Sequence, residues 1–373
     1  MIYHVLPGNC EHLVPAIIVL LKEHTDGGAD SQFLIFCTDV QNERKYESCL
    51  EKGAKIVFLR SPQDLASIVG AMDRRDSLVL HSILHGRLWD FLFRRPRLCR
   101  QAAWVAWGGD FHYDGFLRPR GLRQRLRRWK RGVVARRLRA ICTLVPGDYD
   151  LIAASLGCAG NYFRVSYSLH SLLQQKTPSQ WFDPASAERP LRVLVGNSAA
   201  PTNRHVPVLE ALAPHRQENM EIWCPLSYAE GDPAYATQVV ERGREVLGDR
   251  FKPMMELMPK EQYAAFLDSI DILVFNHSRQ QGLFNLNYML FQGKKVFLRP
   301  ETTTYAMLKE LGIEVGDTDS IATLSFREFA SMEPSARQRN IELAQQHLSM
   351  ECAADQWNRL FAFLRRQRDG RVQ

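Results

Sequence analysis

Short apolar runs alternate with amphipathic segments of helix length along most of this chain, and the alternation occurs twice. In the first half, apolar runs such as 1–6 and 54–59 are each followed by a helical pattern, and the same order resumes at 191–195. Strands that alternate with helices in this way are typical of βαβ units around a parallel sheet. The sequence therefore predicts an α/β protein with two Rossmann-like halves.

The segment 171–190 has a looser texture that is rich in Ser, Gln and Pro, and we interpret it as a linker between domains. This interpretation gives a first domain at 1–170 and a second at 191–350, with a C-terminal helix at 351–373 that can pack back on the first domain. In open parallel sheets, ligands bind at the carboxyl ends of the strands. Two such domains facing each other predict a binding cleft between their sheet edges.

The charge balance favours an anionic partner, because 48 Lys and Arg residues exceed 41 Asp and Glu residues. The net charge of +7 does not by itself choose among nucleic acid, a phospholipid surface and a phosphorylated ligand. The eight Cys residues form no C-x-x-C pair, which favours reduced thiols. The N-terminus lacks a basic signal region, and the apolar run 13–21 is shorter than the roughly 20 residues of a membrane span. We therefore expect a cytoplasmic protein, with contact with a membrane surface left open.

In the second half, the stretch LVGNSAAPTNRH at 194–205 places a small polar loop between a strand and a helix expected to begin near Asn203 or Arg204. Such a loop offers free backbone N–H groups to a phosphate, and an Arg adds a fixed charge. The alternative is an ordinary polar loop. The candidate donor-binding residues here are Gly196, Asn197, Ser198, Asn203 and Arg204.

A second polar loop follows the apolar run at 271–275, in the stretch HSRQQGLFNLNYMLFQGKKVFL at 277–298. Its Arg and Gln side chains can donate hydrogen bonds to an anion or to sugar hydroxyls, and its Gly permits close backbone approach. The alternative is a helix capped by Ser278 or Asn285. Together the two loops could cradle a pyrophosphate and a sugar. The candidates in this loop are Arg279, Gln280, Gln281, Gly282 and Asn285.

In the first half, the stretch AWGGDFHYD at 106–114 combines two glycines with a carboxylate at a strand end. Gly108 and Gly109 leave room for a ligand, and Asp110 could accept the proton of an attacking hydroxyl. The alternative is a turn Asp that caps a helix. His112 in the same loop is a weaker candidate, and His81 at another strand end is a candidate for lining the cleft.

Two patterns that suggest metal binding have better explanations. The DYD sequence at 148–150 opens a helix, so Asp148 is predicted to be its N-cap. His81 and His85 have no third His or Cys ligand nearby in the pattern, which argues against zinc. We predict no bound metal.

A basic run at 118–140 holds eleven Arg or Lys residues and no acidic residue. Leu122, Leu126, Trp129 and Val133 fall at helical spacing between the cations, which suits an amphipathic helix on an anionic bilayer. A solvated helix face is the alternative, and nucleic-acid binding lacks a recognition motif. The candidates for membrane contact are Arg123, Arg127, Arg128, Trp129 and Arg131.

Several ordered stretches resemble the bacterial TDP-N-acetylfucosamine:lipid II N-acetylfucosaminyltransferases, a 4-alpha-L-fucosyltransferase family that acts in enterobacterial common antigen assembly. They are HVLPGN, AWGGDFHYD, PGDYDLIA, VLVGNSAAPTNRH, CPLSY, YAAFLDSIDILVF and RQQGLFNL. The resemblance implies a GT-B glycosyltransferase, whose C-terminal half binds a dTDP-sugar and whose N-terminal half binds a polyprenyl-diphosphate-linked glycan. It adds Pro225 and Tyr228 to the donor site and Gly8 to the acceptor site. It also implies that the enzyme needs no metal or cofactor.

The main hypothesis is transfer of an N-acetylfucosamine-like sugar from a dTDP-sugar to an undecaprenyl-diphosphate-linked saccharide, at the cytoplasmic face of the bacterial inner membrane. Arg279 would stabilise the leaving diphosphate, and Asp110 would be the base if the enzyme inverts configuration. One alternative is a catalytically inactive nucleotide-sugar-binding protein of the same fold. The other is a nucleic-acid-binding protein that uses the basic run.

Overall fold

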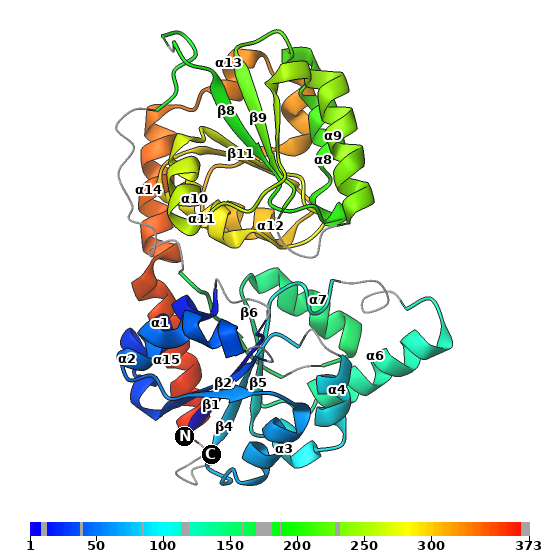
Figure 1. Cartoon of the computed structure of the whole chain (residues 1–373), viewed down its shortest axis with the longest axis vertical. Coiled ribbons are helices and arrows are strands. Elements are labelled where there is room, and N and C mark those ends of the chain that lie inside the picture. Colours follow the sequence, from blue (N-terminus) through cyan, green and yellow to red (C-terminus); the bar gives the residue numbers. More distant parts are fainter. Residues whose placement is uncertain are drawn as a thin grey trace. The chain divides into compact units, whose positions relative to one another are not determined.

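The computed structural model forms two compact units, each built around its own parallel sheet (Figure 1). Unit 1 comprises residues 1–169 together with 349–373, and unit 2 comprises residues 170–348. The structure describes residues 1–8, 13–37, 40–83, 86–112, 119–158, 160–168, 181–186, 188–227 and 232–366.

Unit 1 holds a seven-stranded sheet with the order β3-β2-β1-β4-β5-β6-β7, in which all neighbours are parallel. The strand order reverses between β1 and β4, as in doubly wound folds. Every residue of β4 and β5 is buried, because helices cover both faces of a parallel sheet. The strands are β1 Ile2–Leu6, β2 Ser31–Phe36, β3 Ile56–Leu59, β4 Ser77–His81, β5 Ala102–Ala106, β6 Ala140–Thr143 and β7 Asn161–Arg164.

Helices α1 and α15 lie on one side of this sheet, and α4 and α7 lie on the other (Figure 1). The helices of unit 1 are α1 Val14–Glu23, α2 Glu47–Glu51, α3 Pro62–Gly70, α4 Gly86–Phe93, α5 Pro96–Cys99, α6 Leu122–Ala135, α7 Pro146–Leu156 and α15 Met350–Arg366.

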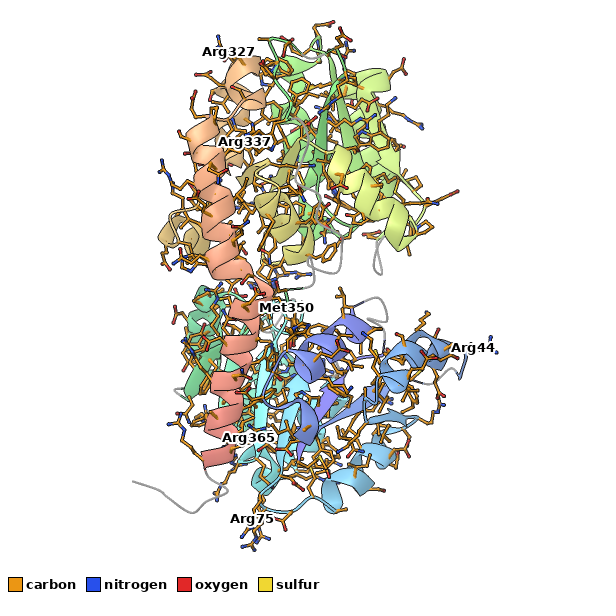
Figure 2. The ribbon with its side chains drawn as sticks, turned by 90° about the vertical axis from the view of Figure 1, so that its left-hand side faces the viewer. Arg44, Arg75, Arg327, Arg337, Met350 and Arg365 are labelled. Carbon is orange, nitrogen blue, oxygen red and sulfur yellow. The ribbon has the colours of Figure 1, made fainter. Side chains whose placement is uncertain are left out.

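The C-terminal helix α15 packs along unit 1, as Figure 2 shows between the labelled Met350 and Arg365. Its buried face carries Trp357, which stacks on His81 with ring centroids 5.5 Å apart. Arg139 Nη2 donates to the carbonyl oxygens of Phe363 at 3.0 Å and Leu364 at 2.8 Å. This Arg satisfies carbonyls in the last turn of α15 that have no partner within the helix.

Unit 2 holds a six-stranded parallel sheet with the order β10-β9-β8-β11-β12-β13. Its strands are β8 Leu191–Val195, β9 Met220–Pro225, β10 Phe251–Met254, β11 Ile272–Phe275, β12 Lys295–Leu298 and β13 Gly316–Asp317. Its helices are α8 His205–Ala211, α9 Pro233–Leu247, α10 Lys260–Ser269, α11 Leu283–Phe291, α12 Thr303–Glu310, α13 Phe326–Ala330 and α14 Pro334–Leu348.

The predicted α/β class with two Rossmann-like halves is confirmed, while two edge strands and one helix cap differ from the local predictions. The sequence patterns did not predict strands β7 and β10. Both strands lie at sheet edges and are only partly buried, so their apolar pattern is weak. The helix expected to begin near Asn203 or Arg204 is present: α8 begins at His205 with Arg204 as its N-cap, in a left-handed conformation with φ of 52°. Asp148 is not an N-cap: α7 begins two residues earlier at Pro146, a residue suited to the first helical position.

Candidate functional site

The loop after β8 is shaped by its own polar side chains. Asn203 Oδ1 accepts a hydrogen bond from the backbone N–H of Asn197 at 2.8 Å, and Asn203 Nδ2 donates to Ser198 Oγ at 2.9 Å. Gly196 has φ of 71°, and a Cβ there would lie 2.2 Å from His205 Nε2. Of the predicted donor-binding residues, Asn203 and Ser198 are therefore buried parts of the loop framework, and Gly196 makes room for an imidazole.

The loop after β11 contacts this first loop, because β8 and β11 are neighbours in the sheet. Gln281 Nε2 donates to Asn197 Oδ1 at 3.3 Å, and Gln281 Oε1 accepts from Thr202 Oγ1 at 2.9 Å. The backbone N–H of Ser278 donates to the Thr202 carbonyl at 2.9 Å. The structure thus brings together the two loops that the sequence singled out, with Gln281 as the bridging side chain.

These two loops and the helices α11 and α12 carry buried polar atoms that have no hydrogen-bond partner in the described part of the chain. They are His205 Nε2, His277 Nε2, Gln280 Oε1, Asn287 Oδ1 and Thr304 Oγ1. Leaving such an atom unsatisfied costs about 1–3 kcal/mol. A ligand that donates and accepts hydrogen bonds here could supply the missing partners.

Both imidazoles in this set are neutral at pH 7. Burial lowers the pKa of His205 to about 4. Burial also lowers the pKa of His277 well below its usual value, with smaller contributions from His205 and the Arg279 charge. Sequence reasoning did not single out either histidine, although both lie inside the two quoted stretches at a strand end or helix start.

The remaining predicted donor residues have varied surroundings. Arg279 is half-buried, and its Nη1 donates to the carbonyl of Gln280 at 3.0 Å, whereas Arg204 is exposed. Asn285 is buried, and its Nδ2 donates to Tyr263 Oη at 2.7 Å, which ties α11 to α10. Gly282 is the N-cap of α11 and has a φ of 69°. Pro225 is buried as the last residue of β9, and Tyr228 lies outside the described residues.

In unit 1, Asp110 is enclosed, with no exposed surface. Its Oδ2 accepts hydrogen bonds from the backbone N–H of Ile83 at 3.0 Å and from Trp104 Nε1 at 2.9 Å, and its Oδ1 accepts from the backbone N–H of Trp107 at 2.7 Å. Burial raises the pKa of Asp110, while these hydrogen bonds act in the opposite direction. The carboxylate therefore joins the ends of β4 and β5. This enclosure does not support its predicted role as a base, which stays a prediction.

His81 is also fully buried. Its Nε2 lies 2.9 Å from His4 Nδ1, and its Nδ1 lies 2.6 Å from Tyr167 Oη, which also accepts a hydrogen bond from Trp107 Nε1. This polar chain lies beneath Trp357 of α15. The burial of His81 does not support its predicted contact with an acceptor.

The other predicted acceptor residues lie in turns. Gly108 has φ of 78°, and its carbonyl accepts the backbone N–H of His112 at 3.0 Å. Gly109 is partly exposed in the same turn. Gly8 approaches the backbone so closely that a Cβ would lie 1.4 Å from the Phe36 carbonyl oxygen. His112 keeps 11% of its side chain exposed.

The basic run forms helix α6, with Leu122, Leu126 and Trp129 exposed on its surface. Arg131 is instead buried over the ring of Trp89, and Arg128 donates to the Ser155 carbonyl at 2.7 Å. These two cations contact the unit itself, while Arg123 and Arg127 remain exposed. In the part of the chain that the structure describes, no helix is both long and apolar enough to cross a bilayer. Within the same residues, no group of three or more His, Cys, Asp or Glu side chains could hold a metal ion.

The solved structures that match this chain over nearly its whole length include three with informative names. HepE from Anabaena, solved with UDP and glucose, is 11% identical, with 97% of this chain and 99% of that chain covered and a TM-score of 0.66. Sucrose-phosphate synthase from Thermosynechococcus elongatus is 13% identical, with 99% of each chain covered and a TM-score of 0.66. A glycosyltransferase from Rickettsia africae is 10% identical, with 98% and 97% covered and a TM-score of 0.62. At these identities the likeness shows the fold alone, which is GT-B as predicted.

The family comparison covers most of the sequence. Residues 1–314 match the model of the 4-alpha-L-fucosyltransferases, glycosyl transferase group 56. This range includes both polar loops of unit 2 and the Gly-Gly-Asp turn of unit 1. The predicted resemblance is therefore confirmed, and the chain belongs to the 4-alpha-L-fucosyltransferase family, glycosyl transferase group 56.

Proposed function

We propose that this member of the family transfers a 4-amino-4,6-dideoxyhexose of the N-acetylfucosamine type from a dTDP-sugar to an undecaprenyl-diphosphate-linked saccharide. The donor binds at the carboxyl edge of the unit 2 sheet, and the acceptor binds unit 1. The reaction takes place at the cytoplasmic face of the bacterial inner membrane, during assembly of a surface polysaccharide of the enterobacterial common antigen type. It uses no bound metal and no cofactor.

The set of unsatisfied buried atoms in unit 2 carries the donor-site proposal. His205 Nε2, His277 Nε2 and Gln280 Oε1 come from the two loops that Gln281 joins, and none has a partner among the described residues. The sugar hydroxyls, the amide and the pyrimidine edge of a nucleotide-sugar offer both donors and acceptors. Such a ligand would offset the free energy that these atoms cost when left unsatisfied.

Two cations of the same loops support a diphosphate position. Arg279 follows β11, and Arg204 precedes α8, with the Glu301 carboxylate within electrostatic reach of Arg204. As the bond to the sugar breaks, negative charge grows on the leaving diphosphate. Fixed positive charges that stabilise this developing charge lower the barrier.

The surface of α6 supports a membrane-bound acceptor. Its exposed Leu122, Leu126 and Trp129 alternate with Arg side chains, and no acidic residue interrupts the helix. Apolar side chains of this kind enter the interface of a bilayer while the cations meet lipid phosphates. The acceptor diphosphate of a lipid-linked glycan lies at the same level.

Calorimetric titration with dTDP, UDP, GDP and duplex DNA tests the donor assignment, and mass spectrometry of reactions with a synthetic lipid-linked acceptor tests the transfer. We expect dTDP to bind most tightly and the product to gain one aminodideoxyhexose. Tight DNA binding without nucleotide binding would overturn the proposal. Nucleotide-sugar binding without transfer to any lipid-linked acceptor would leave a binding protein of the same fold.

A further inference from the structure

We propose that His112, paired with Asp148, is the general base that removes the proton from the acceptor hydroxyl. This inference rests on the proposed transfer and applies to an inverting reaction. It assigns catalysis in unit 1 to a pair of side chains from two neighbouring strand ends. Asp110, two residues before His112, then has a structural role.

The topology of unit 1 places the two side chains at one edge. β5 and β6 are paired, with Ala106 opposite Thr143 near their carboxyl ends. His112 lies in the loop after β5, and Asp148 lies in the first turn of α7, which follows β6. His112 Nε2 is 3.8 Å from Asp148 Oδ1. This separation suits an ion pair and is longer than a hydrogen bond, as is common for catalytic pairs without substrate.

His112 meets the geometric requirement for a base better than Asp110. The oxygens of Asp110 accept three hydrogen bonds within the core, and the residue has no exposed surface. The His112 side chain keeps 11% of its surface exposed, whereas that of Asp148 is 1% exposed. A substrate can therefore reach His112, while Asp148 is shielded from solvent.

Asp148 lies in the first turn of α7, close to the N-terminus of the helix. A carboxylate in the first turn of a helix interacts favourably with the helix dipole. An anionic Asp148 would stabilise the imidazolium that forms when His112 takes a proton. Asp148 is therefore a positioning residue that acts through His112.

The acceptor hydroxyl oxygen forms a bond to the anomeric carbon of the donor sugar, and its proton moves to His112 Nδ1. The bond from that carbon to the diphosphate oxygen breaks, and its electron pair leaves with the nucleoside diphosphate. The imidazolium, held by Asp148, then releases its proton to water. The products are the glycoside, the nucleoside diphosphate and one proton.

The variants His112→Gln and Asp148→Asn test this assignment, with Asp110→Asn as the comparison. We expect H112Q to lower kcat about 10²–10⁴-fold, the usual contribution of a general base, while the Kd for dTDP stays unchanged. D148N should shift the acidic limb of the profile of kcat/KM against pH to lower pH, because the imidazolium loses its counter-charge. D110N should lower Tm and leave that limb in place in the folded enzyme.

The outcomes separate failure of the pair from failure of the proposed function. If H112Q keeps kcat within about threefold of wild type, or if D148N leaves the acidic limb unmoved, the general-base assignment is overturned. Nitrogen-15 NMR titration of His112 in wild type and D148N measures the pairing without any turnover, and an equal pKa in both proteins also overturns it. If the pKa of His112 falls in D148N but the wild-type protein transfers no sugar, then His112 and Asp148 do interact. The proposed transfer, and with it the base role of His112, is then wrong. Rescue of His112→Ala by added imidazole would support the base role even where H112Q folds poorly.

Discussion

Enclosed polar side chains at the carboxyl ends of the strands differ in how far the fold satisfies their hydrogen bonds, as Asp110 and His81 of unit 1 and His277 and Gln280 of unit 2 show. In unit 1, Asp110 accepts three hydrogen bonds and His81 is bonded through both ring nitrogens. In unit 2, His277 and Gln280 are equally enclosed, yet each retains an atom without a partner among the described residues. A polar residue at a strand end is thus a strong ligand candidate only where its own fold leaves it unsatisfied.

Replacing Asp110 by Ala should disrupt the satisfied hydrogen-bond network of unit 1 most severely. The N–H groups of Ile83, Trp104 and Trp107 would lose their acceptor inside the core of unit 1. We expect the free energy of unfolding of unit 1 to fall by about 3–5 kcal/mol, as is usual when one member of a buried charged network is removed. Urea denaturation followed by tryptophan fluorescence measures this change.

Asp90→Ala is the matched control, because the Asp90 carboxylate is 52% exposed and pairs with Lys130 on the surface. This variant should lose less than about 1 kcal/mol. If D110A unfolds at the same urea concentration as wild type, the enclosed network contributes little, and Asp110 regains its place as a candidate base.

Replacing Arg279 by Ala should lower the catalytic activity of the enzyme and leave the stability of unit 2 unchanged. The side chain is half-buried in the loop after β11, and its Nη1 donates to the Gln280 carbonyl at 3.0 Å. We expect kcat/KM to fall about 10²–10³-fold, the usual loss for one donor that stabilises developing charge. Arg244→Ala on exposed α9 is the control and should keep wild-type kinetics. Unchanged kcat/KM in R279A would remove this residue from the site.

The sequence predicted the α/β class and the meeting of two polar loops, because both depend on local patterns and on the general rule that parallel strands end at one edge. It could not predict which of the polar residues would be satisfied. Asp110 is enclosed by Ile83, which lies 27 residues earlier in the chain, and by the indole of Trp104. Similarly, the position of His205 beneath Gly196 depends on the left-handed turn at Arg204. Such contacts arise from packing and carry no periodic signal.

Acid should destabilise both units through their buried histidines. Burial lowers the pKa of His4 in unit 1 to about 3 and that of His205 in unit 2 to about 4, from an ordinary value of 6.5. At a pH between the lowered pKa of each histidine and 6.5, the unfolded chain binds more protons than the folded one. Stability is therefore fully present above pH 6.5 and falls as the pH decreases, by up to about 1.4 kcal/mol per pH unit for each histidine.

Urea denaturation at pH 7.5, 6.0 and 5.0 measures this slope, with His4→Gln and His205→Gln each reducing it in one unit only. If His205 contacts the donor, saturating dTDP should change the pH dependence of the free energy of unfolding of unit 2. The pH dependence for unit 1 should stay the same. Equal stability at pH 7.5 and 5.0 would contradict the burial of neutral imidazoles in either unit.

The smallest expected effect is on membrane binding by α6. This helix carries both cations that contact unit 1 and cations that are exposed to solvent. Arg128 and Arg131 contact the rest of unit 1, whereas Arg123 and Arg127 are exposed beside Leu122. Replacing Arg123 and Arg127 by Ser should weaken binding to anionic vesicles by about 1 kcal/mol per residue, since each cation gains roughly that much near an anionic surface. Sedimentation with phosphatidylglycerol-containing vesicles at low salt measures the loss, and wild-type binding itself should weaken as added salt screens the charges.

The control replaces two exposed cations of unit 2, Arg216 and Arg244, by Ser and changes the net charge by the same amount. If binding depends on total charge, this variant should lose as much affinity as the α6 variant, and the α6 proposal would then be wrong. If α6 is the docking surface, only the α6 variant should leave the vesicle pellet. Arg131→Ser gives the complementary result: it should lower Tm, because the side chain packs over Trp89, and should change vesicle binding of the folded protein little. These two outcomes would show the same distinction within a single helix. The buried cation stabilises the fold, and the exposed cations bind the membrane.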